Sequence, residues 1–210
     1  MKKQIITIGR QCGSGGHTIG KLVAEHLGIP FYDKRILEIV AQRSGLSEET
    51  VKEQGEYTPN SLLYMIATNI SYGYNLTSKE NMPLPDQIHA FQTELIKELA
   101  EKESCVIVGR EADYILQDCP DCFHVFVYGN LEDRKRRVIS EHRVAANEAE
   151  AHVLGRDRKR AGHYKHYTDR TWGQASNYHL CMDSSYFGID TCVEMILKHI
   201  EDRKDQEAER

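Results

Sequence analysis

The sequence predicts an α/β fold in which a mostly parallel β-sheet is covered by helices on both faces. Short apolar runs alternate along the chain with longer segments in which apolar residues recur every three or four positions. A glycine-rich segment separates the first apolar run from the first helical segment. Because 210 residues is long for one domain and short for two, we expect a single domain over residues 1–210 with an inserted subregion.

The chain opens with a predicted strand, a glycine loop and a helix. Gln4 to Ile8 is a short β-branched run that ends at Gly9, as expected of a buried parallel strand. Thr18 to Leu27 carries apolar residues at helical spacing. The order strand, loop, helix therefore begins the alternation on which the predicted fold depends.

Four later apolar runs have the length of strands. Cys105 to Val108 and Phe123 to Tyr128 are the clearest of them. Ile29 to Tyr32 is entered from Gly28 and contains Pro30, and Tyr178 to Met182 is the weakest. Together with the first run, they predict five strands.

Helical patterns lie between these strands. Apolar residues recur at a spacing of three or four over residues 62–70, 88–99 and 189–200. Asn130, with Asp133 three residues later, has the pattern of an N-cap for a helix through Val138. The stretch from about residue 33 to 103 has helical patterns and no convincing strand, so we expect an inserted helical subregion there.

Composition excludes several classes of protein. The net charge of -5 argues against a general nucleic-acid binder, and no apolar stretch is long enough to span a membrane. The N-terminus leaves no room for a signal peptide, so we expect a cytoplasmic protein. Between Arg134 and Arg170, however, there are eleven Lys and Arg against five Asp and Glu, which indicates a local anion-binding surface.

The six cysteines are expected to be reduced thiols in a chain of this size. Cys119 and Cys122 have the spacing of a redox pair or of half a zinc site. Because there is no second pair to complete four ligands, a thiol-redox or metal protein is a minor alternative.

The segment from Gly9 to Thr18 predicts a phosphate-binding loop. Glycines allow positive φ and let backbone N–H groups turn inward, while the start of the helix adds unpaired donors and partial positive charge. Because a strand precedes the segment and a helix follows it, we favour a phosphate cradle over an ordinary tight turn. The predicted nucleotide-binding residues are Gly13, Ser14, Gly15, Gly16, His17 and Thr18.

The loop departs from the usual phosphate-loop motif. When Gly13-Ser14-Gly15 is aligned with the end of that motif, the first glycine becomes Arg10 and the phosphate-clamping lysine becomes Gly16. Arg10 is the preferred replacement cation because it lies in the loop, with His17 or Lys21 as alternatives. His17 takes the place of the metal-binding hydroxyl, so we assign that role to Thr18 by a shift of one residue.

These residues and several later motifs resemble the cytidylate kinase-like family, relatives of bacterial cytidylate kinases with a degenerate phosphate loop. The resemblance spans nearly the whole chain. It includes Ile6-Thr7-Ile8 with Arg10, Gly13 to Gly16, Pro30 to Asp33, Val108-Gly109-Arg110, Asp157 to Arg160 with Tyr164, and Trp172 through Asn177-Tyr178 to Asp183-Ser184.

The resemblance implies a P-loop nucleoside monophosphate kinase fold. This fold has a central five-stranded parallel sheet, a helical monophosphate-binding insertion and a lid, here about residues 145–172. The implied activity is phosphoryl transfer from ATP, with Mg²⁺, to a small nucleotide such as CMP or dCMP. By position, Asp33 and Arg110 would contact the acceptor, while Arg156 and Arg160 would close over the transferred group; Arg10, as the replacement cation, is the third predicted catalytic residue.

Each of these residues has a simpler interpretation. Arg110 follows a strand at its carboxyl end, where open α/β sheets bind ligands, but it could be a solvent-facing loop residue. Arg156 and Arg160 share one helix face, which could be merely solvated. Asp33 could bind a sugar hydroxyl or base amine, or could cap the helix after it. The missing lysine also leaves open a non-catalytic or regulatory nucleotide-binding protein.

Overall fold

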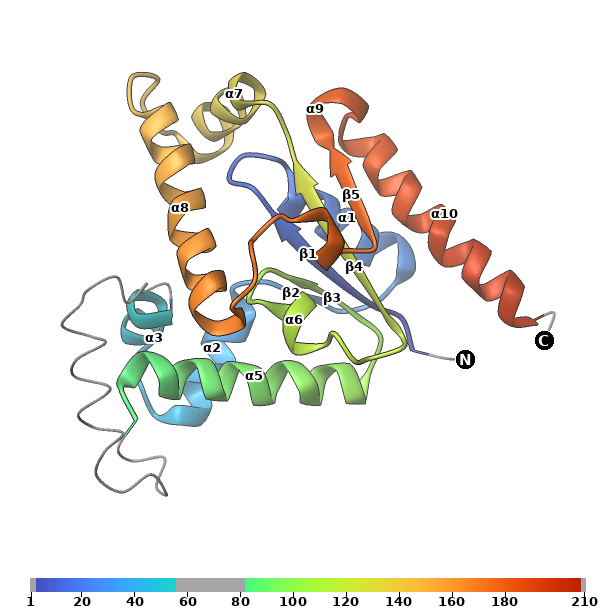
Figure 1. Cartoon of the computed structure of the whole chain (residues 1–210), viewed down its shortest axis with the longest axis horizontal. Helices are drawn as coiled ribbons and strands as arrows, with labels where there is room; N and C mark the ends of the chain where they lie inside the picture. Colours follow the sequence, from blue (N-terminus) through green and yellow to red (C-terminus); the bar gives the residue numbers. More distant parts are fainter. Residues whose placement is uncertain (1–2, 56–81, 209–210) are drawn as a thin grey trace.

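The computed structural model describes residues 3–55 and 82–208. Its five strands form one sheet in the order β2-β3-β1-β4-β5, and every pair of neighbours is parallel (Figure 1). The parallel α/β fold predicted from the sequence is therefore confirmed. The helical pattern over residues 62–70 lies outside the described residues.

The strands match the predicted runs with small shifts at their ends. They are β1 Ile5–Arg10, β2 Phe31–Tyr32, β3 Cys105–Val108, β4 Cys122–Tyr128 and β5 Leu180–Asp183.

β1 continues two residues beyond the prediction because β4 provides partners for both. Gly9 pairs with Phe126 and Arg10 with Val127. Arg10 therefore belongs to the end of a strand, which corrects its expected place in the loop.

The helices lie in the segments that the periodicity indicates, with additional short helices between them. Asn130 caps α7 as predicted, because its side chain accepts a hydrogen bond from the Asp133 N–H at 2.9 Å. The described helices are α1 Gly16–Leu27, α2 Arg35–Ser44, α3 Glu48–Gly55, α5 Leu84–Lys102, α6 Ala112–Ile115, α7 Leu131–His142, α8 Ala149–Thr168, α9 Ser184–Phe187 and α10 Ile189–Ala208, with a 3₁₀ turn at Ala175–Asn177.

Both faces of the sheet are covered, and the alternation of side chains along β1 shows how. Ile6 and Ile8 pack with α1 and α10 on one face, where Ile19 and Ile196 are fully buried. Ile5 points to the other face, into a cluster formed with α2, α3, α5 and α6. Successive strand residues point to opposite faces, so burying both produces the continuous apolar runs seen in the sequence.

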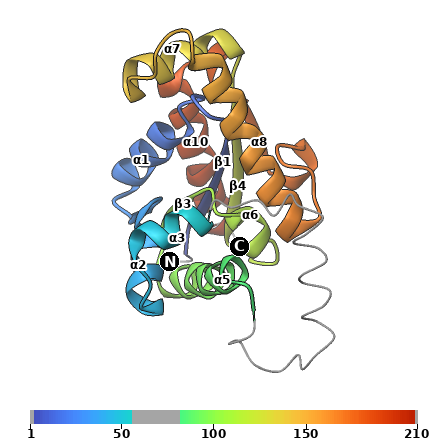
Figure 2. The same ribbon diagram turned by 90° about the vertical axis from the view of Figure 1, so that its left-hand side faces the viewer.

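α8 runs along one side of the molecule from α7 toward α5 (Figures 1 and 2). Near its end, the Tyr167 hydroxyl donates to Asp86 of α5 at 3.0 Å. α8 therefore passes the region where the phosphate loop and the carboxyl ends of the central strands lie. Within residues 3–55 and 82–208, none of the helices combines the length and the apolar character needed to cross a membrane.

Candidate functional site

The loop between β1 and α1 has the geometry of an anion cradle. Gly13 and Gly15 have φ of 73° and 77°, in the left-handed region that glycine adopts readily. The hydrogen-bond ladder of α1 begins with the Ile19 N–H, which donates to the Gly15 carbonyl at 2.9 Å. The N–H groups of Gly16, His17 and Thr18 precede that bond, so they are the open donors of the helix N-terminus.

Side chains from α7 and α9 donate hydrogen bonds to carbonyl groups of the loop. Arg134 Nε donates to the Cys12 carbonyl at 2.8 Å, and Arg137 Nη1 donates to the Gly13 carbonyl at 2.6 Å. Ser184 Oγ donates to the Ser14 carbonyl at 2.6 Å. These bonds fix the orientation of three successive peptide groups. No sequence pattern singled out these three side chains for this role, although both arginines belong to the basic segment.

α8 is attached to the loop through a buried ion pair. The Cys12 N–H donates to Asp157 Oδ1 at 2.7 Å, and the other carboxylate oxygen of Asp157 pairs with Arg134. Arg134 is only 5% exposed. Arg160 Nη1 adds a hydrogen bond to the Arg10 carbonyl at 3.0 Å. The helix that we predicted to be part of a lid is therefore docked on the loop in this structure.

Gly16 lies where a phosphate loop would carry its lysine, and the space beside it is taken by Arg10. A Cβ at Gly16 would be 2.5 Å from the Arg10 Cβ and 3.3 Å from the Val127 Cβ. A lysine at this position would overlap the first carbon of the arginine side chain. Relative to the usual motif, glycine and cation are thus exchanged between positions 10 and 16.

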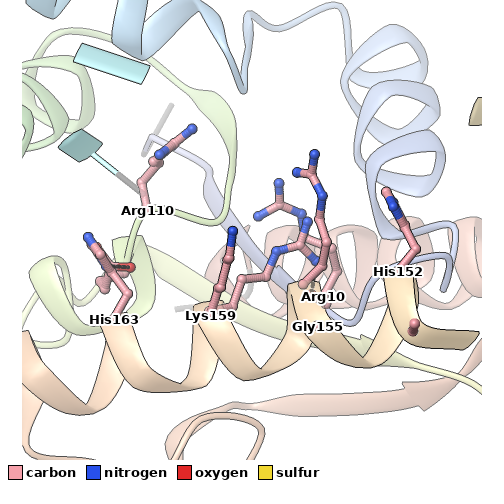
Figure 3. Close-up of a pocket in the computed structure, with 10 residues that line it drawn as sticks. Arg10, Arg110, His152, Gly155, Lys159 and His163 are labelled. Carbon is pink, nitrogen blue, oxygen red and sulfur yellow. Dashed lines mark hydrogen bonds and ion pairs between the residues drawn. The ribbon is translucent and has the colours of Figure 1, made fainter. Parts of the chain in front are cut away.

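The predicted arginines converge on one cavity of about 380 Å³ (Figure 3). Arg10 approaches it from the end of β1, and Arg110 from the turn after β3. α8 contributes Arg156 and Arg160. Residues 13–18 are not among those lining the cavity, so Arg10 is the link between loop and cavity. The lining residues are Arg10, Arg110, Glu111, Ala151, His152, Gly155, Arg156, Lys159, Arg160 and His163.

The spacing of the α8 residues explains their common direction. His152, Arg156, Lys159 and His163 are three or four residues apart and therefore share one helix face. Figure 3 shows His152, Lys159 and His163 along the cavity side of α8, with Arg10 and Arg110 also at the cavity. Five Arg or Lys side chains around one cavity create a strongly positive environment suited to phosphate oxygens.

The turn after β3 has an unusual backbone. Gly109, Arg110 and Glu111 have φ of 74°, 61° and 50°, so two consecutive non-glycine residues adopt the left-handed conformation. Such residues are uncommon and often occur at functional sites. A Cβ at Gly109 would also overlap Arg10 Nη1, so a side chain there would require the end of the Arg10 side chain to move.

Asp33 lies beside Arg10 and His17. Its carboxylate is 3.5 Å from Arg10 Nη2 and 3.1 Å from His17 Nε2. Burial alone would raise the pKa of Asp33, but the hydrogen bond from His17 and the charges of Arg10, His17 and Arg110 lower it overall. The capping alternative is wrong, because the N-cap of α2 is Lys34 and no side chain caps that helix.

The alternative replacement cations, His17 and Lys21, are not among the residues that line the cavity. His17 is directed to Asp33 and packs edge-on against Phe31. Lys21 is exposed, 3.7 Å from Glu25 on the next turn of α1. Thr18, the proposed Mg²⁺ ligand, is partly buried in the first turn of α1.

Three aromatic residues in and after α8, and the Cys119–Cys122 pair, have structural surroundings. Tyr164 donates its hydroxyl to buried Asp113 at 2.7 Å, Tyr167 stacks on His89, and Trp172 packs edge-on against Phe126. Burial raises the pKa of the Cys122 thiol, which disfavours a reactive thiolate at the Cys119–Cys122 pair. Among the described residues, no cluster of three or more His, Cys, Asp or Glu could hold a metal ion.

A five-stranded parallel sheet with a glycine loop between its first strand and helix defines the class of P-loop kinase-type α/β proteins. Within this class, the chain belongs to the cytidylate kinase-like family, whose model matches residues 5–186. A comparison with curated proteins finds no match.

Solved structures share the fold of this chain. An uncharacterized protein from Eubacterium ventriosum ATCC 27560 is 29% identical, with a TM-score of 0.70 over 95% of this chain and 99% of that chain. Shikimate kinase from Bacteroides thetaiotaomicron is 16% identical, with a TM-score of 0.53 over 94% and 98% of the two chains. Shikimate kinase from Acinetobacter baumannii, in complex with shikimate, is 15% identical, with a TM-score of 0.52 over 97% and 96%. The two shikimate kinases support the fold alone.

Proposed function

We propose that this protein is a cytoplasmic, ATP-dependent kinase that transfers a phosphoryl group to a nucleoside monophosphate, CMP or dCMP in particular. The observation that carries the proposal is the convergence of Arg10, Arg110, Arg156, Lys159 and Arg160 on one cavity beside the phosphate loop. Phosphoryl transfer depends mainly on positioning and on neutralising charge on the phosphate oxygens, and guanidinium groups do both.

The loop residues Gly13 to Thr18 would hold the ATP phosphates. Their open N–H donors and left-handed glycines fit such a ligand. Mg²⁺ bound with ATP neutralises charge on the phosphates, and the Thr18 hydroxyl is its proposed protein ligand. One hydroxyl is sufficient because Mg²⁺ usually keeps several waters and takes most other ligands from phosphates.

The arginines would share the remaining work. Arg10 replaces the absent lysine as the cation between loop and cavity, held in place by Asp33. Arg110 in the turn after β3 would contact the acceptor nucleotide together with Asp33, which begins the helical subregion at about residues 33–103. Arg156 and Arg160 of the proposed lid, about residues 145–172, would bind the transferred phosphoryl group.

A coupled assay of ADP release tests the activity. ATP and Mg²⁺ are supplied with CMP, dCMP, UMP, AMP or GMP in turn, and CMP or dCMP should give the highest kcat/KM. Arg10→Ala should lower kcat by about 10²- to 10³-fold, as loss of one pre-organised charge contact does. Lys21→Ala is the matched control, since it removes an exposed cation of the adjoining helix α1 and should leave the rate unchanged.

Absence of turnover with every monophosphate, in protein shown to be folded, would reject the kinase proposal. Calorimetry then decides the alternative, a non-catalytic or regulatory nucleotide-binding protein. The absent lysine favours that alternative, and nucleotide binding without turnover would support it.

A further inference from the structure

Two polar side chains without a phosphate-binding role line the cavity at its far end. Glu111 follows Arg110 in the turn after β3, and His163 lies at the end of the α8 row away from His152 (Figure 3). Glu111 Oε1 and His163 Nδ1 are 3.0 Å apart. Gln92 Nε2 of α5 donates to Glu111 Oε2 at 3.4 Å, and His89 Nε2 is 3.8 Å from the same oxygen.

The surroundings of Glu111 keep it ionised. Burial alone would raise the pKa of Glu111, but the hydrogen bond from His163 and the charge of Arg110 lower it overall. An ionised carboxylate only accepts hydrogen bonds, so His163 must donate from Nδ1. An imidazole whose single proton lies on Nδ1 carries its lone pair on Nε2.

The second ring nitrogen of His163 is available to a ligand. Among the described residues, no hydrogen-bond partner contacts Nε2, and the residue lines the cavity although it is only 8% exposed. A buried carboxylate that fixes one ring nitrogen is an arrangement that orients the other. Glu111 itself adopts a left-handed backbone, which is expected to be retained only where the surroundings favour it strongly.

The cavity therefore has two ends along α8, one lined by arginines and the other by Glu111 and His163. With a rise of about 1.5 Å per residue, His163 is about 5 Å beyond Arg160 and about 10 Å beyond Arg156 along the helix axis. An acceptor whose phosphate lies among the arginines would place its other end near Nε2. That nitrogen accepts a hydrogen bond, whereas the arginines only donate.

We propose that Glu111 and His163 determine acceptor specificity: Nε2 of His163 accepts a hydrogen bond from an amine or hydroxyl at the end of the acceptor remote from its phosphate. The inference rests on the proposed function and defines its substrate more closely. The exocyclic amine of the cytosine ring in CMP donates such a bond. The carbonyl at the same position of UMP faces a lone pair and leaves both groups unpaired, so UMP is disfavoured.

The test compares CMP with UMP in the wild type, Glu111→Gln and His163→Phe. In Glu111→Gln, the new amide group can donate to Nδ1, which moves the ring proton to Nε2 and converts that nitrogen to a donor. We expect the ratio of kcat/KM for CMP over UMP to fall about tenfold in both variants, the size of one unmatched buried hydrogen bond. His142→Gln, at the exposed end of α7, is the control and should keep the wild-type ratio.

A readout in the unaltered protein covers the case in which the variants do not fold. In the wild type, CMP should give a higher kcat/KM than UMP, because only CMP carries a donor at the position that faces Nε2. A ratio that is close to one in the wild type, or unchanged in the folded variants, overturns the inference.

Calorimetry separates this inference from the kinase proposal. If the wild type binds CMP more tightly than UMP without turnover, and Glu111→Gln abolishes the difference, the inference stands and the kinase proposal fails. If CMP is phosphorylated and the ratio does not respond to the variants, the kinase proposal stands and the inference fails. If neither nucleotide binds, both fail.

Discussion

At the scale of single residues, Gly109 leaves open the space that the Arg10 guanidinium occupies. Its left-handed φ of 74° disfavours a side chain, and a Cβ there would overlap the end of the Arg10 side chain. Gly45, at the end of α2, has nearly the same φ of 73°, but no described atom lies within 4 Å of the place that a Cβ would take. Comparing substitutions at the two glycines therefore separates the effect of backbone strain from the effect of displacing Arg10.

We predict that Gly45→Ala lowers the free energy of unfolding by about 1 kcal/mol and leaves activity unchanged, because only the backbone is strained. Gly109→Ala should carry a similar backbone penalty and also displace Arg10 from Asp33, so nucleotide turnover should fall at least tenfold. Urea denaturation and the ADP-release assay measure the two effects. Equal activity of the two variants would contradict the role of Gly109.

His124 should make the stability depend on pH. It lies in β4, hydrogen-bonded to Thr7 Oγ1 through Nδ1 at 2.8 Å, and burial, with the charge of His179, lowers its pKa from 6.5 to about 4. Between these two values the unfolded chain binds the proton and the folded protein does not, so stability falls as the pH decreases.

We predict that the wild type loses about 2.5 kcal/mol relative to His124→Gln between pH 6.5 and pH 4. Denaturant titrations of both proteins across this range measure the difference. The pKa of Asp113, which burial raises to about 6, has the opposite effect on stability, but it is common to both proteins and cancels. A difference that does not vary with pH would contradict the burial of a neutral His124.

Residue roles were only partly predictable from the sequence. Arg10, Arg110, Arg156 and Arg160 could be selected because motif positions and helix spacing mark them, and the structure brings them to one cavity. The Glu111–His163 pair could not be selected, because its members are 52 positions apart and only the packing of α8 on the β3 turn joins them.

At the scale of elements, the attachment of α8 to the loop depends on the pair Arg134–Asp157. Both side chains are largely buried, and each also binds a backbone group of Cys12. Removing one partner leaves the other charge buried without compensation, which is much more destabilising than loss of an exposed pair.

We predict that Asp157→Asn lowers the free energy of unfolding by about 3 kcal/mol. Asp202→Asn, which removes the exposed pair with Lys198 in α10, should change it by less than about 0.5 kcal/mol. In the double variant Arg134→Met with Asp157→Leu, much of the loss should be recovered, because no buried charge remains. Chemical denaturation of the variants checks all three, and equal effects of the two single changes would contradict a buried anchor.

Element prediction succeeded where periodicity and burial agreed. β3 occupies the predicted residues Cys105–Val108, all of them buried. β2 is shorter than its apolar run and begins only after Pro30, which has no N–H to donate. α1 begins two residues before Thr18, because Gly15 in the left-handed conformation allows Gly16 to enter the helix. The short helices α6 and α9 span four residues each, too few to show a period.

At the scale of the whole molecule, the order of strands in the sheet determines which strand ends lie side by side. β1 lies between β3 and β4, so Arg10 and the turn after β3 open at the same edge of the sheet. The alternation of strands and helices predicted the class of fold, but it contains no information on the order of strands. The position of the cavity therefore could not be derived from sequence patterns.

Ligands should stabilise the folded chain if they bind at this edge. We predict that ATP with Mg²⁺, at about 100 times its Kd, adds about 2.7 kcal/mol to the free energy of unfolding, or a rise in Tm of about 5 to 10 °C. Adenosine, which lacks phosphates, is the control and should give little shift. Thermal unfolding measures both, and an equal shift with adenosine would contradict binding through phosphates.

The hydrogen bond from Arg160 to the Arg10 carbonyl joins residues 150 positions apart. β1 likewise pairs with strands about 100 and 117 positions later, so the chain must close long loops before the cavity exists. Folds dominated by such distant contacts gain their native interactions slowly. In refolding experiments, recovery of nucleotide affinity should therefore mark the last stage of assembly, after helical signal has returned.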